Sequence, residues 1–91
     1  MELSLTKLYI YCLFGDADVF EGVYSSLKSA HRDALKIANK GTGGVFLTYD
    51  GQQTAATLPV LKKIFNGELD IKVEYKSSKG RATIIKTKLR E

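Results

Sequence analysis

Cysteine, proline and histidine each occur once in this 91-residue chain, and tryptophan does not occur at all. The single cysteine, Cys12, excludes an intramolecular disulfide, and its apolar neighbours predict a buried thiol in a reducing compartment. The N-terminal apolar run is interrupted by Glu2 and is too short to cross a bilayer, so neither a membrane span nor a signal peptide is expected. These absences favour a soluble, cytoplasmic protein.

Negative charge is also scarce, because 10 Asp and Glu residues stand against 14 Lys and Arg and leave a formal net charge of +4. That excess suits an anionic partner, although a modest net charge also serves solubility alone. Low-complexity tracts and blocks of like charge are missing, which argues against disorder. We therefore expect a single folded domain spanning residues 1–91, long enough to close one hydrophobic core.

Strands are predicted wherever apolar runs are rich in aromatic and β-branched residues. Asp50 and Gly51 form a favoured two-residue hairpin turn after one such run. Residues 52–57 are then either a short further strand or, because of their alanines, the beginning of the next helix. The runs before that point indicate strands at residues 7–15, 19–25 and 43–51.

Two helices are predicted, each with its own start signal. Ser25 or Ser26 can accept the free backbone N–H groups of a helix over residues 26–40, which Gly41 is suited to end. Thr57 precedes a proline and is a suitable cap for a second, short helix. The apolar face of the first helix consists of Leu27, Ala30, Ala34, Ile37 and Ala38.

The predicted order is β-β-α-β-(β)-α-β-β, where the parenthesis marks the strand at residues 52–57. Strands and helices mixed in this way, with short connections, are typical of the α+β class. We therefore predict a single small α+β domain with a mainly antiparallel sheet and two helices on one face.

The last two strands form a predicted hairpin, residues 71–90, that carries seven of the fourteen Lys and Arg residues. If Gly80 takes the left-handed position of a three-residue loop, Tyr75 pairs with Thr83. Shifting the register by one residue would bury Lys86, and the burial of an unpaired ammonium group is costly. The first register is therefore preferred.

Alternation along these two strands assigns each side chain to a face of the hairpin. The inner face then holds Ile71, Val73, Tyr75, Thr83, Ile85, Thr87 and Leu89. The outer face gathers the candidate phosphate contacts Lys72, Lys76, Lys86, Lys88 and Arg90. Lysines on edge strands also prevent unwanted pairing between sheets, so a purely structural role stands beside the functional one.

A second basic feature lies on the first predicted helix, where Lys and Arg recur every four residues along one side. Asp33 is the only carboxylate near them, whereas a solvated helix face usually mixes both signs. We expect this stripe to extend the cationic track of the hairpin. Its members are Lys28, Arg32, Lys36 and Lys40.

Three segments resemble the RNA recognition motif, a four-stranded RNA-binding domain of similar length. "LYIYCL" (residues 8–13) resembles the first-strand signature of that family, and "KGTGGVFLTY" (40–49) has the basic-glycine opening of its second signature. "IFNGELDIKVEYK" (64–76) resembles the passage from its last helix to its last strand. The resemblance implies RNA binding, with base-stacking candidates Tyr9 and Tyr11.

The sequence departs from this family pattern in three places, one of which is that no room is left for the strand that the family has between its first helix and the segment at residues 44–49. Thr42 and Gly44 stand where the second signature has stacking aromatics, so that part of the binding platform is missing. A predicted hairpin also follows the first strand, where the family has a helix.

A longer segment, "YIYCLFGDADVFEGVYSSLKSAHRDA" (residues 9–34), is similar in style to short accessory proteins of tailed phages. The shared features are a strand, a tight hairpin and an alanine-bearing helix. Many proteins of that sort bind and block a host enzyme or nucleic acid. The similarity implies an inhibitor or a protein–protein interaction module as the alternative function.

No catalytic or metal-binding motif emerges from the sequence. Asp16, Asp18 and Glu21 lie in or beside a predicted hairpin turn, but no further metal-ligand pattern follows them. His31 borders the apolar face of the first helix, and a packed ring is a simpler interpretation than a general base without a partner. We expect neither catalysis nor a cofactor nor a metal.

The leading hypothesis is a non-enzymatic binding protein that presents a basic surface to nucleic acid, either RNA or single strands. The alternative is an interaction module or inhibitor whose basic face docks an acidic host protein. An exposed edge strand containing Ala82 and Ile84 would also support a homodimer formed by strand pairing.

Overall fold

The computed structural model describes residues 9–39, 44–66 and 71–88. The predicted α+β class is confirmed, and the segment that begins at residue 52 is a strand. The elements are β1 (Tyr9–Phe14), the 3-10 turn η2 (Asp16–Asp18), β2 (Phe20–Tyr24), α1 (Leu27–Ala38), β3 (Phe46–Tyr49), β4 (Gln52–Ala55), α2 (Leu58–Ile64), β5 (Ile71–Lys76) and β6 (Arg81–Lys88).

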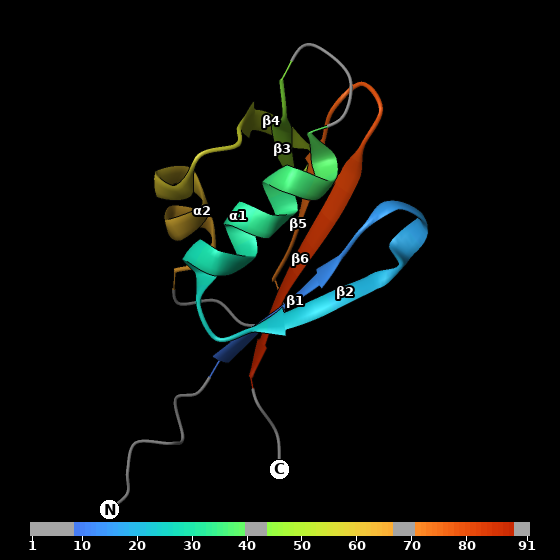
Figure 1. Ribbon diagram of the computed structural model, residues 1–91. Helices are drawn as coiled ribbons and strands as arrows, with labels where there is room; N and C mark the ends of the chain where they lie inside the picture. The colour runs from blue at the N-terminus through green and yellow to red at the C-terminus, as the bar shows by residue number, and fades with distance from the viewer. Residues whose placement is uncertain (1–8, 40–43, 67–70, 89–91) are drawn as a thin grey trace, which may run out of the picture.

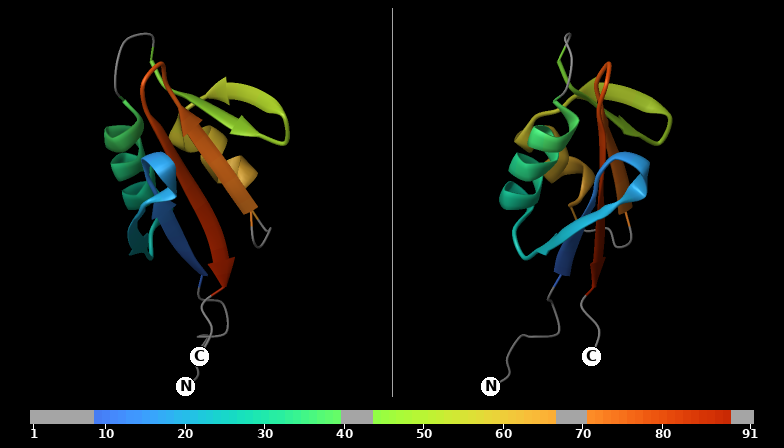
Figure 2. Two further views of the ribbon diagram at one scale, coloured as in Figure 1. Left: turned by 90° about the vertical axis from the view of Figure 1, so that its right-hand side faces the viewer. Right: turned by 45° about the vertical axis from the view of Figure 1, so that its right-hand side comes forward.

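All the strands join one antiparallel sheet in the order β2-β1-β6-β5-β3-β4. Both helices lie against the same face of this sheet, here named the covered face (Figure 1). The opposite face, here named the open face, is turned toward the viewer on the left of Figure 2, and neither α1 nor α2 covers it. Among the described residues, the helices are too short or too polar to pass through a bilayer.

Signals within a few residues explain where the helices and turns form. Ser26 is the N-cap of α1, and its Oγ accepts a hydrogen bond from the backbone N–H of Ser29 at 3.3 Å. Asp50 and Gly51 have φ angles of 53° and 76°, as a two-residue hairpin turn between β3 and β4 requires. Thr57 occupies the N-cap of α2, although its side chain accepts no capping hydrogen bond.

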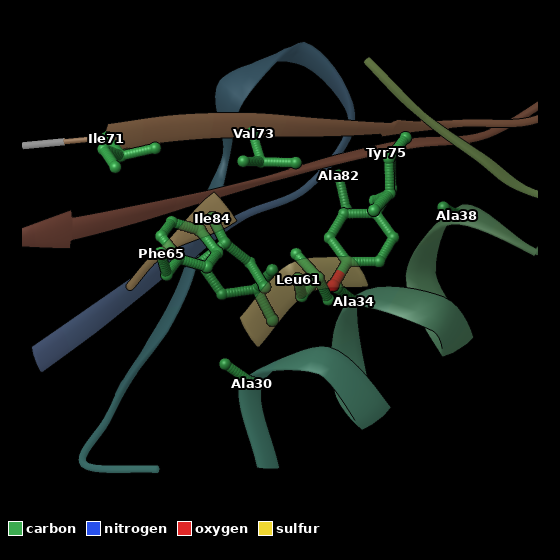
Figure 3. Packing of buried hydrophobic residues seen from close by; sticks show 12 residues of the cluster. Ala30, Ala34, Ala38, Leu61, Phe65, Ile71, Val73, Tyr75, Ala82 and Ile84 are labelled. Carbon is green, nitrogen blue, oxygen red and sulfur yellow. The ribbon is translucent and has the colours of Figure 1, made fainter. Parts of the chain in front are cut away.

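The hydrophobic core lies between the covered face and the two helices (Figure 3). Small side chains allow α1 to approach the sheet closely, and Leu61 and Phe65 fill the space beside it. His31 packs here as well, and its Nδ1 lies 2.7 Å from the Tyr75 hydroxyl, which confirms the prediction of a packed ring. The alanines of α1 in this core are Ala30, Ala34 and Ala38.

The register predicted for the C-terminal hairpin is wrong by one residue. Lys76 pairs with Arg81, so the loop comprises residues 77–80, and Tyr75 lies opposite Ala82. Every residue of β6 therefore lies on the other face from the one predicted. Ala82, Ile84 and Lys86 are on the covered face, and Thr83, Ile85 and Thr87 are on the open face.

Gly80 is required in this loop for a different reason from the one predicted. Its φ is not in the left-handed region. A Cβ on Gly80 would instead lie 2.4 Å from the carbonyl oxygen of Ala38, at the end of α1. The Ser77 hydroxyl donates to the same carbonyl at 2.5 Å and accepts from the Gly80 N–H at 3.0 Å. The close approach of α1 therefore excludes any side chain here.

Lys86 is buried, with 7% of its surface exposed, because its ammonium group has partners on the covered face. The Nζ atom donates a hydrogen bond to the Phe65 carbonyl at 2.6 Å and lies 4.8 Å from the centre of the Tyr9 ring. The predicted register assumed that a buried lysine would have no partner, whereas Lys86 has two. The observed register also buries Ala82 and Ile84 completely.

Two further predictions are corrected by the topology. Ala82 and Ile84 are not on an edge strand, because β6 lies between β1 and β5, and the edges of the sheet are β2 and β4. Cys12 is only partly buried. Its side chain lies on the open face, since its neighbours Tyr11 and Leu13 both pack on the covered face.

Candidate nucleic-acid interface

The basic stripe of α1 lies on the side of the helix that faces away from the sheet. Lys28, Arg32 and Lys36 are all exposed, while the alanines on the opposite side of the helix are buried. Eight residues separate the first cation from the last, so the stripe is about 12 Å long. Lys40, its predicted fourth member, lies outside the described residues.

The second helix adds two cations to the same layer. Lys62 and Lys63 are exposed in the last turn of α2, next to the buried Leu61. At about 100° per residue, Lys62 lies on the flank of α2 opposite Val60, and Lys63 points away from the sheet. The basic helix layer is defined here by Lys28, Arg32, Lys36, Lys62 and Lys63.

Asp33 is the one carboxylate that the two helices contain. Its Oδ2 accepts a hydrogen bond from the Tyr24 hydroxyl at 2.7 Å, and its Oδ1 lies 3.3 Å from Arg32 Nε. The hydrogen bond from Tyr24 lowers the pKa of Asp33, and the same interaction raises the pKa of Tyr24. Asp33 therefore partly neutralises Arg32, and its carboxylate also interacts electrostatically with Lys36.

Among the described residues, most of the excess positive charge lies in the helix layer. The two helices carry five cations and one carboxylate. The described residues of the sheet and its turns carry six cations and five carboxylates, so that part of the molecule is nearly neutral. The described positive charge is therefore concentrated on the side of the helices and not on the open face.

The structure divides the cations that were predicted to act together on the hairpin. Lys72 and Lys76 are exposed on the open face, and Lys76 Nζ lies 3.9 Å from a carboxylate oxygen of Glu74. Lys86 is buried on the covered face, and Lys88 is exposed at the end of β6. Arg90 lies outside the described residues. Lys72 and Lys76 are therefore on the face opposite the stripe of α1, and Lys86 is not exposed.

The two tyrosines proposed as stacking platforms face the helices and not the open face. The Tyr11 ring packs edge-on against Phe65 with a centroid distance of 5.8 Å, and burial raises the pKa of its hydroxyl. Tyr9 lies under the ammonium group of Lys86. Both rings already have intramolecular partners, and neither lies beside Lys72 or Lys76 on the open face.

A hollow of about 250 Å³ lies beside the basic helix layer, between α2 and the β3–β4 hairpin. Sequence reasoning missed it, and it also missed Lys62 and Lys63. The lysines could have been found, because placing Leu58, Leu61 and Phe65 in the core turns both outward. The hollow could be identified only from the tertiary structure, because its lining comes from α2 and from the β3–β4 hairpin. It is lined by Tyr49, Gln52, Thr54, Val60, Lys63 and Ile64.

No group of three or more potential metal ligands occurs within the described part of the chain. No protein-family model, curated protein or solved structure matches the sequence or the fold. Any assignment of function therefore depends on the geometry and charge of the surfaces described above.

Proposed function

We propose that this chain is a non-enzymatic binding protein that holds the phosphate backbone of RNA or of another single strand against its basic helix layer. The observation that supports this function is the concentration of the described positive charge on two neighbouring helices, in which Asp33 is the one carboxylate. A solvated surface without a partner usually mixes the two signs.

The layer presents several cations to a run of phosphates. The stripe of α1 places three cations along about 12 Å, and Lys62 and Lys63 add two more, so contacts with about four phosphates of one strand are expected. Lys62 lies on α2, which contacts α1, and thereby broadens the stripe into a surface. Affinity for such a surface comes mainly from the release of counterions.

The hollow beside Lys63 supports a single strand over a duplex. Tyr49 offers an aromatic ring, Gln52 and Thr54 offer hydrogen-bonding groups, and Lys63 stands at the edge nearest the helices. An unpaired base can enter such a site and stack while its phosphate remains on the lysine. A base held in a duplex cannot turn outward without losing its own stacking.

The decisive test compares two pairs of charge reversals in fluorescence-anisotropy titrations of a labelled single-stranded oligonucleotide. Lys28→Glu with Lys36→Glu reverses two charges of the stripe, whereas Lys72→Glu with Lys76→Glu makes the same change in net charge on the open face. If about four phosphates are neutralised, raising the salt from about 50 to about 200 mM should weaken binding by about 50-fold.

We expect the helix pair to weaken binding at least about tenfold and to flatten the salt dependence, while the open-face pair has a much smaller effect. Equal losses for the two pairs would mean that binding follows net charge alone. Binding that is unchanged in the helix pair would refute the proposed function.

An acidic protein is the second candidate partner, because the same cations would attract its carboxylates. The two candidates differ in what occupies the hollow, since a protein supplies no base to stack on Tyr49. The ratio of absorbance at 260 and 280 nm in the purified protein separates them. A protein free of nucleic acid that captures an acidic partner would favour this second candidate.

A further inference from the structure

The hollow beside the basic helix layer lies on the covered face, at one edge of the sheet. Leu47 of β3 is completely buried on that face, and alternation places Tyr49 on the same side. Gln52 lies opposite Tyr49, and Thr54 lies opposite Leu47, so both side chains of β4 also face α2. Because β4 is the last strand of the sheet, a ligand can enter the hollow from that edge.

The apolar part of the lining suits the flat faces of a nucleobase. Val60 and Ile64 come from α2, and the Tyr49 ring comes from β3. All three side chains are only partly buried, so they retain surface that an aromatic ligand can cover. The volume of about 250 Å³ equals that of about eight water molecules at about 30 Å³ each, which leaves room for one base.

The polar groups of the lining are arranged on two sides. Gln52 and Thr54 are two residues apart on β4, so they present hydrogen-bonding groups about 7 Å apart along one strand. Within the described part of the chain, neither side chain forms a hydrogen bond. The charged residue of the lining, Lys63, comes from α2 and belongs to the basic helix layer. A phosphate on Lys63 therefore leaves the edge of its base to the polar groups of β4.

The chemistry of the Gln52 carboxamide indicates which base fits. A carboxamide offers a donor beside an acceptor. Adenine has its N6 donor between two acceptors, N7 and N1, so either of its edges matches that pattern. Guanine presents two acceptors, O6 and N7, on the corresponding edge, and the pyrimidines have one matching edge each. A purine also covers more apolar lining than a pyrimidine does.

We propose that the hollow is an adenine-binding site, in which Gln52 pairs with the edge of the base, the Tyr49 ring stacks on its face, and Lys63 holds the adjoining phosphate. The inference rests on the proposed function, because the basic helix layer brings the strand to the hollow. Phosphate contacts carry no sequence information, so this site gives the surface its base preference. A bidentate pair between glutamine and adenine favours that base by about 5- to 150-fold.

Labelled RNA strands of about eight nucleotides test this preference. Every position but one central position carries hydrogen in place of the base, and the central position carries adenine, guanine, cytosine, uracil or no base. The backbone charge is then the same in all the strands. Fluorescence anisotropy at about 50 mM salt measures each affinity. We expect the adenine strand to bind at least about fivefold more tightly than any other strand.

Two adjacent glutamines provide a matched pair of variants. Gln52→Leu removes the carboxamide from the hollow, whereas Gln53→Leu makes the same change on the open face, because Gln53 lies opposite Thr48. Both glutamines are exposed, and neither substitution changes the net charge. Gln52→Leu should reduce the adenine preference to less than about twofold and leave the affinity for the baseless strand unchanged. Gln53→Leu should change neither quantity, and circular dichroism confirms that each variant is folded.

Nuclear magnetic resonance of the ¹⁵N-labelled full chain gives a direct measurement without substitution. Adding the adenine strand should move the side-chain amide signals of Gln52 and leave those of Gln53 in place. Adding the baseless strand should move neither pair of signals.

The outcomes distinguish the adenine site from the proposed function on which it rests. If the baseless strand does not bind, the phosphate contact is absent and both proposals are wrong. If the baseless strand binds but the four bases are bound equally, or guanine is bound best, the helix layer still holds a strand and the adenine site is wrong. An adenine preference that survives Gln52→Leu would also overturn the site.

Discussion

The contact between Gly80 and the end of α1 can be tested by adding a single methyl group. A Cβ on Gly80 would lie 2.4 Å from the carbonyl oxygen and 2.9 Å from the carbonyl carbon of Ala38. Ordinary van der Waals contact begins near 3.4 Å, so the last turn of α1 must move by about 1 Å. That movement also disturbs the hydrogen bond from the Ser77 hydroxyl to the same carbonyl.

We expect Gly80→Ala to lower the free energy of unfolding by about 2–4 kcal/mol. Overpacking a close contact costs about 1–3 kcal/mol, and the loss of a hydrogen bond adds about 1 kcal/mol. In a domain of this size each kcal/mol lowers Tm by about 4–8 °C, so Tm should fall by about 10 °C or more. Gly51→Ala is the matched control, because Gly51 has φ +76° but nothing within 4 Å of a Cβ. Its cost is conformational, about 1–2 kcal/mol.

Asparagine variants distinguish the two reasons for a glycine, which are the close approach of α1 at Gly80 and the left-handed backbone at Gly51. It tolerates the left-handed region better than alanine does, but it is larger. Gly51→Asn should therefore be more stable than Gly51→Ala, whereas Gly80→Asn should be no more stable than Gly80→Ala. Urea unfolding followed by circular dichroism measures all four variants. A Gly80→Asn protein as stable as the unmodified chain would refute the explanation based on close approach.

Two buried polar groups give further predictions. Burial lowers the pKa of His31, so the unfolded chain binds the proton more tightly than the folded chain does, and stability should fall as the pH drops below about 6.5. His31→Gln should reduce this pH dependence in urea midpoints measured between about pH 7.5 and 5.5, and an unchanged slope would contradict the assignment. Lys86→Met should lower the free energy of unfolding by about 1–3 kcal/mol, because the buried Phe65 carbonyl loses its donor. Lys86→Glu should cost more, and a Lys86→Glu chain with unchanged stability would show that Lys86 is at the surface.

Much of the local structure could be predicted from the sequence because its causes lie within a few residues. Ser26 caps α1 through the backbone of Ser29, and Asp50-Gly51 turns the chain through its own φ angles. The spacing of alanines along α1 identified the buried face of that helix and, with it, the exposed basic stripe. None of these inferences depended on where another element lies.

The hairpin register could not be predicted in the same way, because distant groups decide it. Alternation is equally consistent with two registers that differ by one residue. The choice depends on the Phe65 carbonyl, which pairs with Lys86, and on Ala38, which occupies the space beside Gly80. Both groups lie outside the hairpin, Phe65 just after α2 and Ala38 at the end of α1, so no pattern within residues 71–90 could have revealed them.

The amino-acid sequence by itself determined that this is one α+β domain with a basic helix stripe, because hydrophobic period, caps and turn residues act over short distances. Only the tertiary structure decided which charges share a surface. The sheet separates Lys72 and Lys76 from the helix layer, and it buries Lys86 among core groups. The physical reason is that one step of strand register moves a side chain from one face to the other, and long-range contacts select that step.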